Sequence, residues 1–325
     1  FPSNEFRNAK YHGINFRYLT LSVCIPIYNT DVRALVEELC AQISKIQTAQ
    51  IDIILIDDAS DVAFRQRNHY DHPKVHFIQL ETNIGRSKIR NTFLKYTNAE
   101  YLLFIDGDST VLDPSFLKRY VAYLLQHQNM AILVGASVYQ DTTPDLPYRL
   151  RWKYSTSRES LSYERRKKLQ DAGFKTNNFL IRRSVFEKLP FEEKLLGYGH
   201  EDTLFGLQLV AKGIRIEHID NPVWNFKLDT NSEFLKKTDN AIANLLWICA
   251  NYKDDLRLVE KNKLLRYFIS MKSFWLGKFA LGVLAFHQPL VSRILQTGLA
   301  PLFLFDLYRL GRLYQLNKDP QYHLR

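Results

Sequence analysis

The sequence has few cysteines and no long uncharged apolar run. Among its 325 residues it has three cysteines, Cys24, Cys40 and Cys249, each in an apolar pattern without paired spacing. We therefore expect reduced thiols in the core rather than a disulfide framework, which favours a cytosolic compartment. No uncharged stretch reaches the roughly 20 residues that a membrane-spanning helix requires. The printed residues also contain no signal-peptide pattern.

Two binding motifs are missing as well. No G-x-G-x-x-G turn follows the first predicted strand, which argues against a dinucleotide-dependent oxidoreductase. No nucleic-acid-binding motif is present either, so a nucleic-acid partner is not expected. The formal net charge of +10 nevertheless favours an anionic partner, such as a nucleotide, a phospholipid surface or a phosphorylated glycan.

Strand and helix patterns alternate from Leu19 onward, which is typical of an α/β fold with a parallel sheet. Short apolar runs predict strands at Leu19–Ile27, Ile51–Ile56, Val75–Leu80, Tyr101–Ile105, Ile132–Val138, Asn178–Arg182 and Ile214–Ile219. Helical spacing between them predicts helices over 32–43, 86–96, 115–127 and 201–211. We expect a catalytic domain over residues 1–250, with residues 1–18 as a lead-in.

Two later segments differ from this alternation. Between Tyr148 and Gln170 the periodicity is lost and basic residues dominate, which predicts an insertion or a mobile loop. Residues 251–325 are helical in pattern, aromatic and basic, which predicts an amphipathic helical extension. These helices could lie in a membrane interface, or they could cover the catalytic core, and the pattern leaves both alternatives open.

Three acidic pairs stand at strand ends or at a helix start. Asp57 and Asp58 follow the second strand, and Asp106 and Asp108 follow the fourth. Glu201-Asp202 opens a helix behind a glycine-flanked loop. One such pair is more often a turn or a cap than a site. Three pairs at one edge of a sheet would repel one another unless a metal or a substrate used them, and two carboxylates suit Mg²⁺ or Mn²⁺.

Four motifs in this order resemble the family 2 glycosyltransferases: Val23-Cys24-Ile25-Pro26-Ile27-Tyr28-Asn29, Ile56-Asp57-Asp58-Ala59-Ser60, Asn83-Ile84-Gly85 with Arg90-Asn91, and Asp106-Gly107-Asp108. The resemblance implies a Rossmann-like GT-A fold that binds a nucleotide sugar on a mostly parallel central sheet. It also implies a UDP-sugar donor, Mn²⁺ or Mg²⁺, and a nucleotide-sugar half over about 19–140 with an acceptor half over about 170–250.

The activity implied by the resemblance is inverting transfer of a hexose or an N-acetylhexosamine to a glycan or lipid-linked acceptor, in bacterial polysaccharide assembly. We expect a cytoplasmic protein, peripheral on the cytoplasmic face of the membrane. Donors linked to GDP or dTDP remain an alternative, as does a non-catalytic relative that binds sugar or membrane.

The resemblance also implies donor-side roles for particular residues. The residues expected to bind the nucleotide are Pro26, Tyr28, Asn29, Asp58, Asn83, Gly85, Arg86, Arg90, Asp106 and Gly107. Among these, Asp58 would accept a hydrogen bond from uracil, whereas Asp57 would be structural. Asp108 would bind the metal and Asp106 would contact the ribose or, through water, the metal. Lys88 either meets the donor phosphates or belongs to a solvated helix face.

On the acceptor side, Asp202 is the predicted base. The residues expected to bind the acceptor or donor sugar are Glu201, Gly199, His200, Tyr198 and Trp224. For Tyr198 and Trp224, packing is an equal alternative. Related enzymes often carry a histidine metal ligand after the base, where this chain has Asn225. His218 is the possible substitute, or else an ordinary histidine at a strand end.

Overall fold

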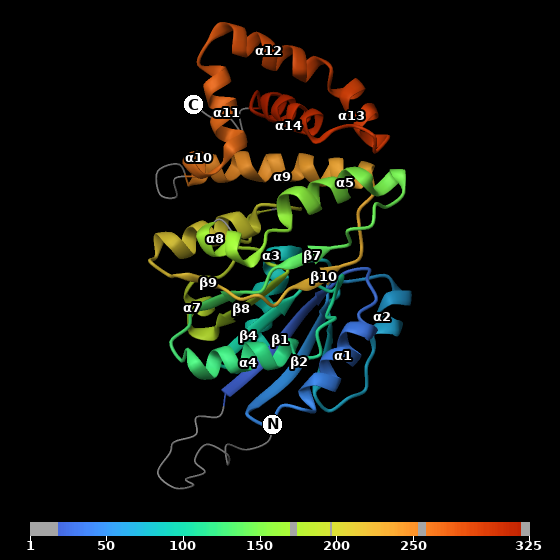
Figure 1. Cartoon of the computed structure of the whole chain (residues 1–325), viewed down its shortest axis with the longest axis vertical. Coiled ribbons are helices and arrows are strands. Elements are labelled where there is room, and N and C mark those ends of the chain that lie inside the picture. The colour runs from blue at the N-terminus through green and yellow to red at the C-terminus, as the bar shows by residue number, and fades with distance from the viewer. Residues whose placement is uncertain (1–18, 170–173, 196, 253–257, 320–325) are drawn as a thin grey trace.

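A computed structural model describes residues 19–169, 174–195, 197–252 and 258–319. The lead-in expected for residues 1–18 lies outside these ranges, as do parts of the predicted extension. Figure 1 shows an elongated chain with three tiers: a twisted sheet with its helices, a middle layer that includes α5 (Arg149–Tyr154) and α8 (Glu201–Ala211), and a block of C-terminal helices beyond α9 (Asn231–Asn251).

The main sheet has seven strands in the order β3-β2-β1-β4-β8-β6-β9. Their bounds are β1 (Leu19–Ile27), β2 (Ala49–Asp57), β3 (Val75–Gln79), β4 (Tyr101–Ile105), β6 (Ile132–Val134), β8 (Asn178–Arg182) and β9 (Ile216–His218). β1 pairs in parallel with β2 and β4, whereas β8 runs antiparallel to β4 and β6. The predicted α/β fold with a mostly parallel sheet is confirmed.

Strand β4 shows why these apolar runs form central strands. All five of its residues are buried, and alternate side chains enter opposite faces of the sheet. Leu103 packs in the core beneath α1 (Arg33–Ile43) and α4 (Phe116–Gln126), and Phe104 in the core on the other face. The Phe104 ring stacks on Phe179 of β8 at a centroid distance of 4.8 Å. Packing from both faces therefore fixes the end of β4, where Asp106 follows.

A second, three-stranded sheet has the order β5-β10-β7, with β5 (Ser109–Thr110), β10 (Val223–Asn225) and β7 (Ser137–Tyr139). The single strand predicted over Ile132–Val138 is wrong, because the chain leaves the main sheet after β6. Ala136 has a φ of 70°, and a Cβ at Gly135 would collide with the Tyr120 hydroxyl. This turn moves β7 beside β10, next to the end of β4.

The segment from Tyr148 to Leu169 is mostly helical, so the prediction of a mobile loop is wrong for it. It contains α5, a turn of π-helix over Ser155–Glu159, and α6 (Tyr163–Leu169). Its basic residues are partly structural, since Arg151 is buried and pairs with Glu159 at 2.8 Å. Arg166 is also buried and donates to the carbonyl oxygen of Val134 at 3.1 Å. An arginine-rich segment can thus pack when carboxylates and carbonyl groups receive the guanidinium groups.

The remaining helices outside the C-terminal block are short connections. They are α2 (Val62–Asn68), α3 (Arg86–Thr92) with a 3₁₀ turn over Phe93–Lys95, and α7 (Arg183–Lys188). Helix α3 begins directly after Gly85, whose φ of 83° provides the turn out of the preceding loop.

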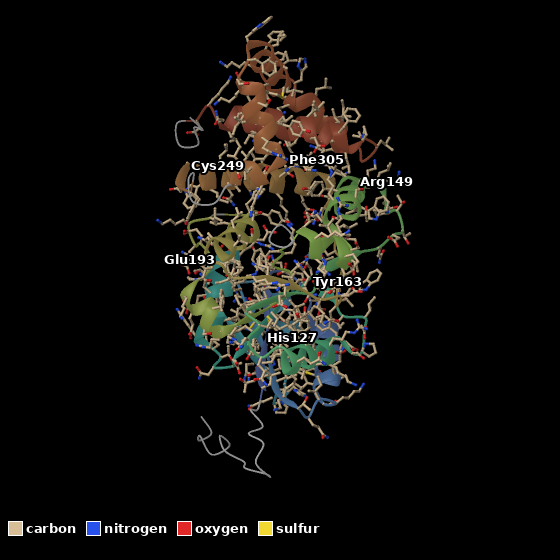
Figure 2. All side chains as sticks on the ribbon, turned by 60° about the vertical axis from the view of Figure 1, so that its left-hand side comes forward. His127, Arg149, Tyr163, Glu193, Cys249 and Phe305 are labelled. Atoms are coloured by element: carbon tan, nitrogen blue, oxygen red, sulfur yellow. The ribbon has the colours of Figure 1, made fainter. Side chains whose placement is uncertain are left out.

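The C-terminal helices pack on α9, which begins with a capping box between Thr230 and Glu233. They are α10 (Leu258–Lys261), α11 (Lys263–Lys272), α12 (Trp275–Phe286), α13 (Gln288–Gln296) and α14 (Leu302–Leu316). Phe305 of α14 stacks on Phe234 of α9 at 5.2 Å, and Figure 2 shows Phe305 at the level of α9. Helices α13 and α14 therefore cover α9, and α11 and α12 pack on α14.

Among the described residues, no single helix is long and apolar enough to cross a membrane. Helices α11 and α12 meet the length and composition criteria only when taken together, and they are bent by 118°.

Candidate active site

A pocket of about 820 Å³ opens at the carboxyl ends of β1 and β4. Carboxylates from all three predicted acidic clusters line it: Asp58, Asp106, Asp108, Glu201 and Asp202. The parallel pairing of β1 with β2 and β4 explains why the strand ends meet here. The structure therefore brings these five carboxylates, which are up to 144 positions apart in the sequence, into one cavity.

Asp58 holds the turn that precedes α3. Its carboxylate accepts hydrogen bonds from the backbone N–H groups of Ile84, at 2.7 Å, and Gly85, at 3.1 Å. Burial is the main cause that raises its pKa, and these two bonds oppose the rise. Both carboxylate oxygens of Asp58 are thus already hydrogen-bonded within the chain, and the hydrogen bond from uracil to Asp58 stays a prediction. Asp57 is fully buried and accepts from the Ser60 N–H, as expected of a structural residue.

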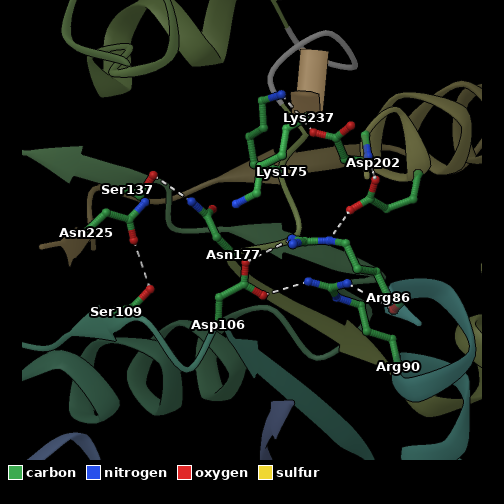
Figure 3. Close-up of polar contacts among 12 residues, drawn as sticks. Arg86, Arg90, Asp106, Ser109, Ser137, Lys175, Asn177, Asp202, Asn225 and Lys237 are labelled. Atoms are coloured by element: carbon green, nitrogen blue, oxygen red, sulfur yellow. Dashed lines mark hydrogen bonds and ion pairs between the residues drawn. The ribbon is translucent and has the colours of Figure 1, made fainter. Parts of the chain in front are cut away.

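Two arginines of α3 engage Asp106. Arg90, only 2% exposed, donates to Asp106 Oδ1 at 2.6 Å. Arg86 donates to Glu201 Oε1 at 2.7 Å and lies 3.5 Å from Asp106 Oδ2 (Figure 3). Although burial alone would lower the pKa of Arg86, the charges of Glu201 and Asp106 raise it. Arg90 is therefore a buried partner of Asp106 that also lines the pocket, and its contact with the nucleotide stays a prediction. Arg86 connects Asp106 with Glu201.

The other donor-side residues also line the pocket: Pro26, Tyr28, Asn29, Asn83, Gly85 and Gly107. Gly107 leaves little room, since a Cβ there would lie 3.1 Å from the Pro26 carbonyl oxygen. Lys88, in contrast, is not among the residues that line the pocket. The alternative that Lys88 belongs to a solvated helix face therefore agrees better with its position.

Asp108 faces the same pocket one residue beyond Gly107. Burial, and then the charge of Asp106, raises the pKa of Asp108. A nearby cation would relieve this unfavourable charge. The described residues contain no group of three or more histidine, cysteine, aspartate or glutamate side chains placed to hold a metal ion. Two carboxylates still fit Mg²⁺ or Mn²⁺, because these ions commonly keep water and substrate phosphates as their other ligands.

Two predicted residues are placed away from the pocket. His218 does not line it, and its Nδ1 lies 3.1 Å from the Arg166 guanidinium, so its position agrees better with the alternative of an ordinary histidine at a strand end than with a metal ligand. Trp224 does not line the pocket either, whereas its neighbour Asn225 does. Successive residues of β10 point to opposite sides, which explains the difference. Asn225 accepts a hydrogen bond from the Ser109 hydroxyl at 3.0 Å, beside the Asp106-Gly107-Asp108 turn.

The loop before α8 is held in one tight conformation. Gly197 and Gly199 have φ values of 73° and 100°, and His200 has a left-handed φ of 66°. A Cβ at Gly199 would lie 2.6 Å from Ala241 of α9, so this glycine allows close approach of the two segments. The Gly199 N–H also donates to Glu201 at 3.1 Å. The loop thereby sets the direction in which Glu201 and Asp202 enter the pocket.

Asp202 is paired with Lys175, which the sequence analysis missed. Lys175 Nζ lies 2.7 Å from Asp202 Oδ2, and the Thr203 N–H donates to Asp202 Oδ1 at 2.7 Å. Burial would raise the pKa of Asp202, but Lys175 and the other partners lower it to about 2. The charge of Asp202 in turn raises the pKa of Lys175. The carboxylate is therefore ionised at neutral pH and held by a cation.

The neighbours of Asp202 complete this wall. Burial lowers the pKa of His200 to about 4, so its imidazole is neutral at pH 7. The Tyr198 ring lies 5.0 Å from Arg86 and 5.0 Å from Lys237, in two cation–π contacts. Tyr198 therefore sits between cations within the pocket.

The C-terminal block contributes to the same cavity. Leu264 of α11 and both Phe305 and Arg309 of α14 line the pocket, together with residues of α9. The sequence analysis did not predict this, because periodicity shows which face of a helix is apolar but not what the helix contacts. The extension therefore forms part of the pocket wall.

Comparison with known proteins places these features in a family. The family model described as Glycosyl transferase family 2 matches residues 22–190, which is more than half of the chain. The uncharacterized glycosyltransferase EpsJ of Bacillus subtilis (strain 168) is 25% identical over 228 residues, covering 65% of this chain and 62% of EpsJ. Poly(ribitol-phosphate) beta-N-acetylglucosaminyltransferase TarS of Staphylococcus aureus (strain Mu50 / ATCC 700699) is 26% identical over 146 residues, covering 39% of this chain and 24% of TarS.

The chain thus spans less than two thirds of the length of both curated relatives. Among solved structures, the mannosyltransferase PcManGT from Pyrobaculum calidifontis, in complex with GDP-Man and Mn²⁺, superposes with a TM-score of 0.59 at 14% identity. The superposition covers 94% of this chain and 88% of PcManGT, and it supports the same fold.

Proposed function

Since this chain belongs to glycosyl transferase family 2, we propose that it is an inverting, metal-dependent enzyme of that family. In this proposal it moves a hexose or N-acetylhexosamine from a UDP-sugar to a glycan or lipid-linked acceptor. One observation carries the proposal: a single pocket is lined by Asp106 and Asp108, which follow β4 and which we call the donor wall, and by Glu201 and Asp202, which begin α8 and which we call the acceptor wall. The donor wall would receive a metal-bound diphosphate, and the acceptor wall an acceptor hydroxyl.

On the donor wall, the nucleoside would lie beside Asp58 and the turn over 83–85, and the diphosphate would lie toward Asp108. Asp108 would hold Mn²⁺ or Mg²⁺ directly, and Asp106 would do so through water, because Arg90 and Arg86 already engage its carboxylate. When bound, the ion supplies positive charge that stabilises the departing nucleoside diphosphate. Arg86 adds a second positive charge beside the same position.

On the acceptor wall, Asp202 is the proposed general base. The acceptor oxygen attacks the anomeric carbon, Asp202 accepts the hydroxyl proton, and the bond from that carbon to the diphosphate oxygen breaks. Glu201, fixed by Arg86 and the Gly199 N–H, would orient a sugar hydroxyl. A single displacement by a base opposite the leaving group inverts the anomeric configuration.

The donor choice rests on the resemblance and on the family relatives. TarS is named as an N-acetylglucosaminyltransferase, which supports an N-acetylhexosamine donor. The fold neighbour PcManGT was solved with GDP-Man, so GDP-linked sugars are an alternative donor class. The dTDP-linked alternative rests on the resemblance alone. The name of TarS includes a poly(ribitol-phosphate) acceptor, whereas for this chain a glycan or a lipid-linked glycan on the cytoplasmic face of a membrane is proposed.

The proposal is tested with a panel of UDP-, GDP- and dTDP-sugars, scored by thermal stabilisation of the protein with and without Mn²⁺. UDP-sugars are expected to raise the Tm most, and only when the metal is present. A larger shift with a GDP- or dTDP-sugar would change the donor class. Full stabilisation in chelator would contradict the metal role, and stabilisation without any sugar transfer to acceptors would favour a non-catalytic relative.

A further inference from the structure

Helix α12 is apolar on two opposite faces. Gly277, Leu281 and Ala285 form its buried stripe, which faces the helical block. On the opposite side, Trp275, Phe279 and Phe286 are 74%, 68% and 81% exposed. These exposed residues follow the spacing of one helical stripe, with Val283 between them, and α12 lies at the outer edge of the molecule (Figure 1). A soluble surface helix normally places polar residues on that side.

The same exposure continues on both neighbours of α12. Other large apolar side chains from α11 to the start of α14 are also exposed: Tyr267, Ile269, Phe274, Leu276, Leu290, Ile294, Leu299 and Phe303. We call these residues, together with the outer stripe of α12, the outer apolar set. Exposure of so many large apolar side chains within one run of the chain favours an interaction surface over isolated surface residues.

The charged residues of the chain between residues 261 and 305 are all basic. From residue 261 to residue 305 the chain contains no aspartate and no glutamate. The basic residues in this stretch are Lys261, Lys263, Arg266, Lys272, Lys278 and Arg293. Of these, Lys278 on α12 and Arg293 on α13 are exposed among the apolar side chains. Aromatic side chains interleaved with lysine and arginine, without an acid between residues 261 and 305, complement an apolar surface that carries negative charge.

We propose that α11 to α13 dock on the surface of an anionic lipid bilayer, with the outer stripe of α12 inserted among the lipids. The helices would lie in the interface, because no single described helix is long enough to span and α11 and α12 are bent by 118°. Exposed Lys278 and Arg293 would meet the lipid headgroups.

Docking would link membrane binding to the helices that line the pocket. Leu264 of α11 and Arg309 of α14 line the pocket, while the outer stripe belongs to α12, which packs on both helices. The helical block thus has a lipid-facing side and a pocket-facing side. This consequence rests on the proposed function, whereas lipid binding itself does not, since it is measured without any nucleotide sugar.

The test is co-sedimentation of the full chain with vesicles of phosphatidylcholine, or of phosphatidylcholine mixed with phosphatidylglycerol. We expect binding to the mixed vesicles and weak binding to pure phosphatidylcholine. The double variant Phe279→Ser/Phe286→Ser should lower the affinity for mixed vesicles by at least about tenfold, because two inserted aromatic rings are lost. Lys278→Glu/Arg293→Glu should lower it by at least about tenfold as well, and high salt should do the same.

Matched controls distinguish vesicle binding through the outer apolar set from nonspecific vesicle binding. Leu112→Ser/Leu125→Ser removes two exposed apolar side chains of the α/β part, and Lys45→Glu/Lys118→Glu reverses two exposed charges there. Both controls should bind mixed vesicles as the unmodified chain does. Equal binding to both vesicle types, or equal loss in variants and controls, would overturn the proposal. Self-association in the absence of lipid that Phe279→Ser/Phe286→Ser abolishes would also overturn it, since a second copy would then be the occupant.

Discussion

Two apolar regions of this chain have opposite environments. Strand β4 consists of five apolar residues, all of them buried between layers of helices. Helix α12 is also strongly apolar, yet only its inner stripe is buried and its outer stripe is exposed. The difference lies in the number of covering layers, because β4 has helices on both faces of its sheet and α12 has a neighbour on one side. Apolar composition therefore predicts that a surface will be covered, but not by what.

The two regions also differ in their expected contribution to activity. The α/β part supplies the carboxylates of the pocket, whereas the outer side of the helical block supplies none of them. Pocket variants should consequently leave vesicle binding unchanged, and outer-stripe variants should leave sugar transfer unchanged when no lipid is present.

The largest effect is expected for Asp202→Asn, an isosteric change in the pocket. Loss of the proposed base should lower kcat/KM for sugar transfer by about 10²–10⁴-fold, with UDP affinity and vesicle binding nearly unchanged. Steady-state kinetics, UDP titration and co-sedimentation measure the three quantities. Asp141→Asn, an exposed surface change, is the control. Equal losses of transfer and UDP affinity would assign Asp202 to donor binding instead.

The second effect concerns stability. Phe104→Ala should lower the free energy of unfolding by about 3–5 kcal/mol, because it opens a cavity beside Phe179 in a core closed on both sides. Urea denaturation monitored by circular dichroism measures it. A loss below about 1 kcal/mol would mean that the core beside β4 is loosely packed.

The third effect is a shift in pH dependence through Lys175→Met. The side chain of Lys175 is 48% exposed, but its charge, with the hydrogen bonds to Asp202, holds the pKa of that carboxyl at about 2. Without the cation, burial remains and the pKa rises. Since a base must be ionised, activity is lost as pH falls through this pKa, so the acid limb of kcat/KM should move to higher pH. Lys175→Arg should keep the original profile, and an unchanged limb in Lys175→Met would exclude this coupling.

The smallest effect is expected on the outer stripe of α12. Phe279→Ser should change the free energy of unfolding by no more than about 0.5 kcal/mol, since the ring is 68% exposed. Urea denaturation without lipid measures this change beside Phe104→Ala. A loss approaching that of Phe104→Ala would show that the stripe is covered by protein, and the contrast between the two regions would fail.

Local patterns predicted much of the α/β part. The Leu19–Ile27 and Asn178–Arg182 strands match β1 and β8, because apolar runs bounded by turn residues report buried strands directly. The predicted strand over Ile132–Val138 fails after Gly135, where close approach of Tyr120 leaves room only for glycine and the chain turns out of the sheet at Ala136 with a φ of 70°. That constraint depends on Tyr120 of α4, and the periodicity of the strand carries no information about a contact with another element.

Part of the candidate site was also predictable from local patterns in the sequence. Turn and helix-start signals placed Asp106, Asp108 and Asp202, since each stands at a boundary between elements. The Arg86–Glu201 pair spans 115 residues, and Lys175 follows a segment without clear periodicity, so neither had a local signal. Trp224 does not line the pocket whereas Asn225 does, and this alternation was not predicted because the short strand β10 was not recognised.

The measurement that tests the central claim most directly is the anomeric configuration of the transfer product, made from an α-linked UDP-sugar with Mn²⁺ and analysed by NMR. The proposed mechanism predicts a β-linked product, formed in Mn²⁺ and lost in chelator. An α-linked product, or undiminished transfer in chelator, would contradict an inverting, metal-dependent reaction between the walls of Asp108 and Asp202.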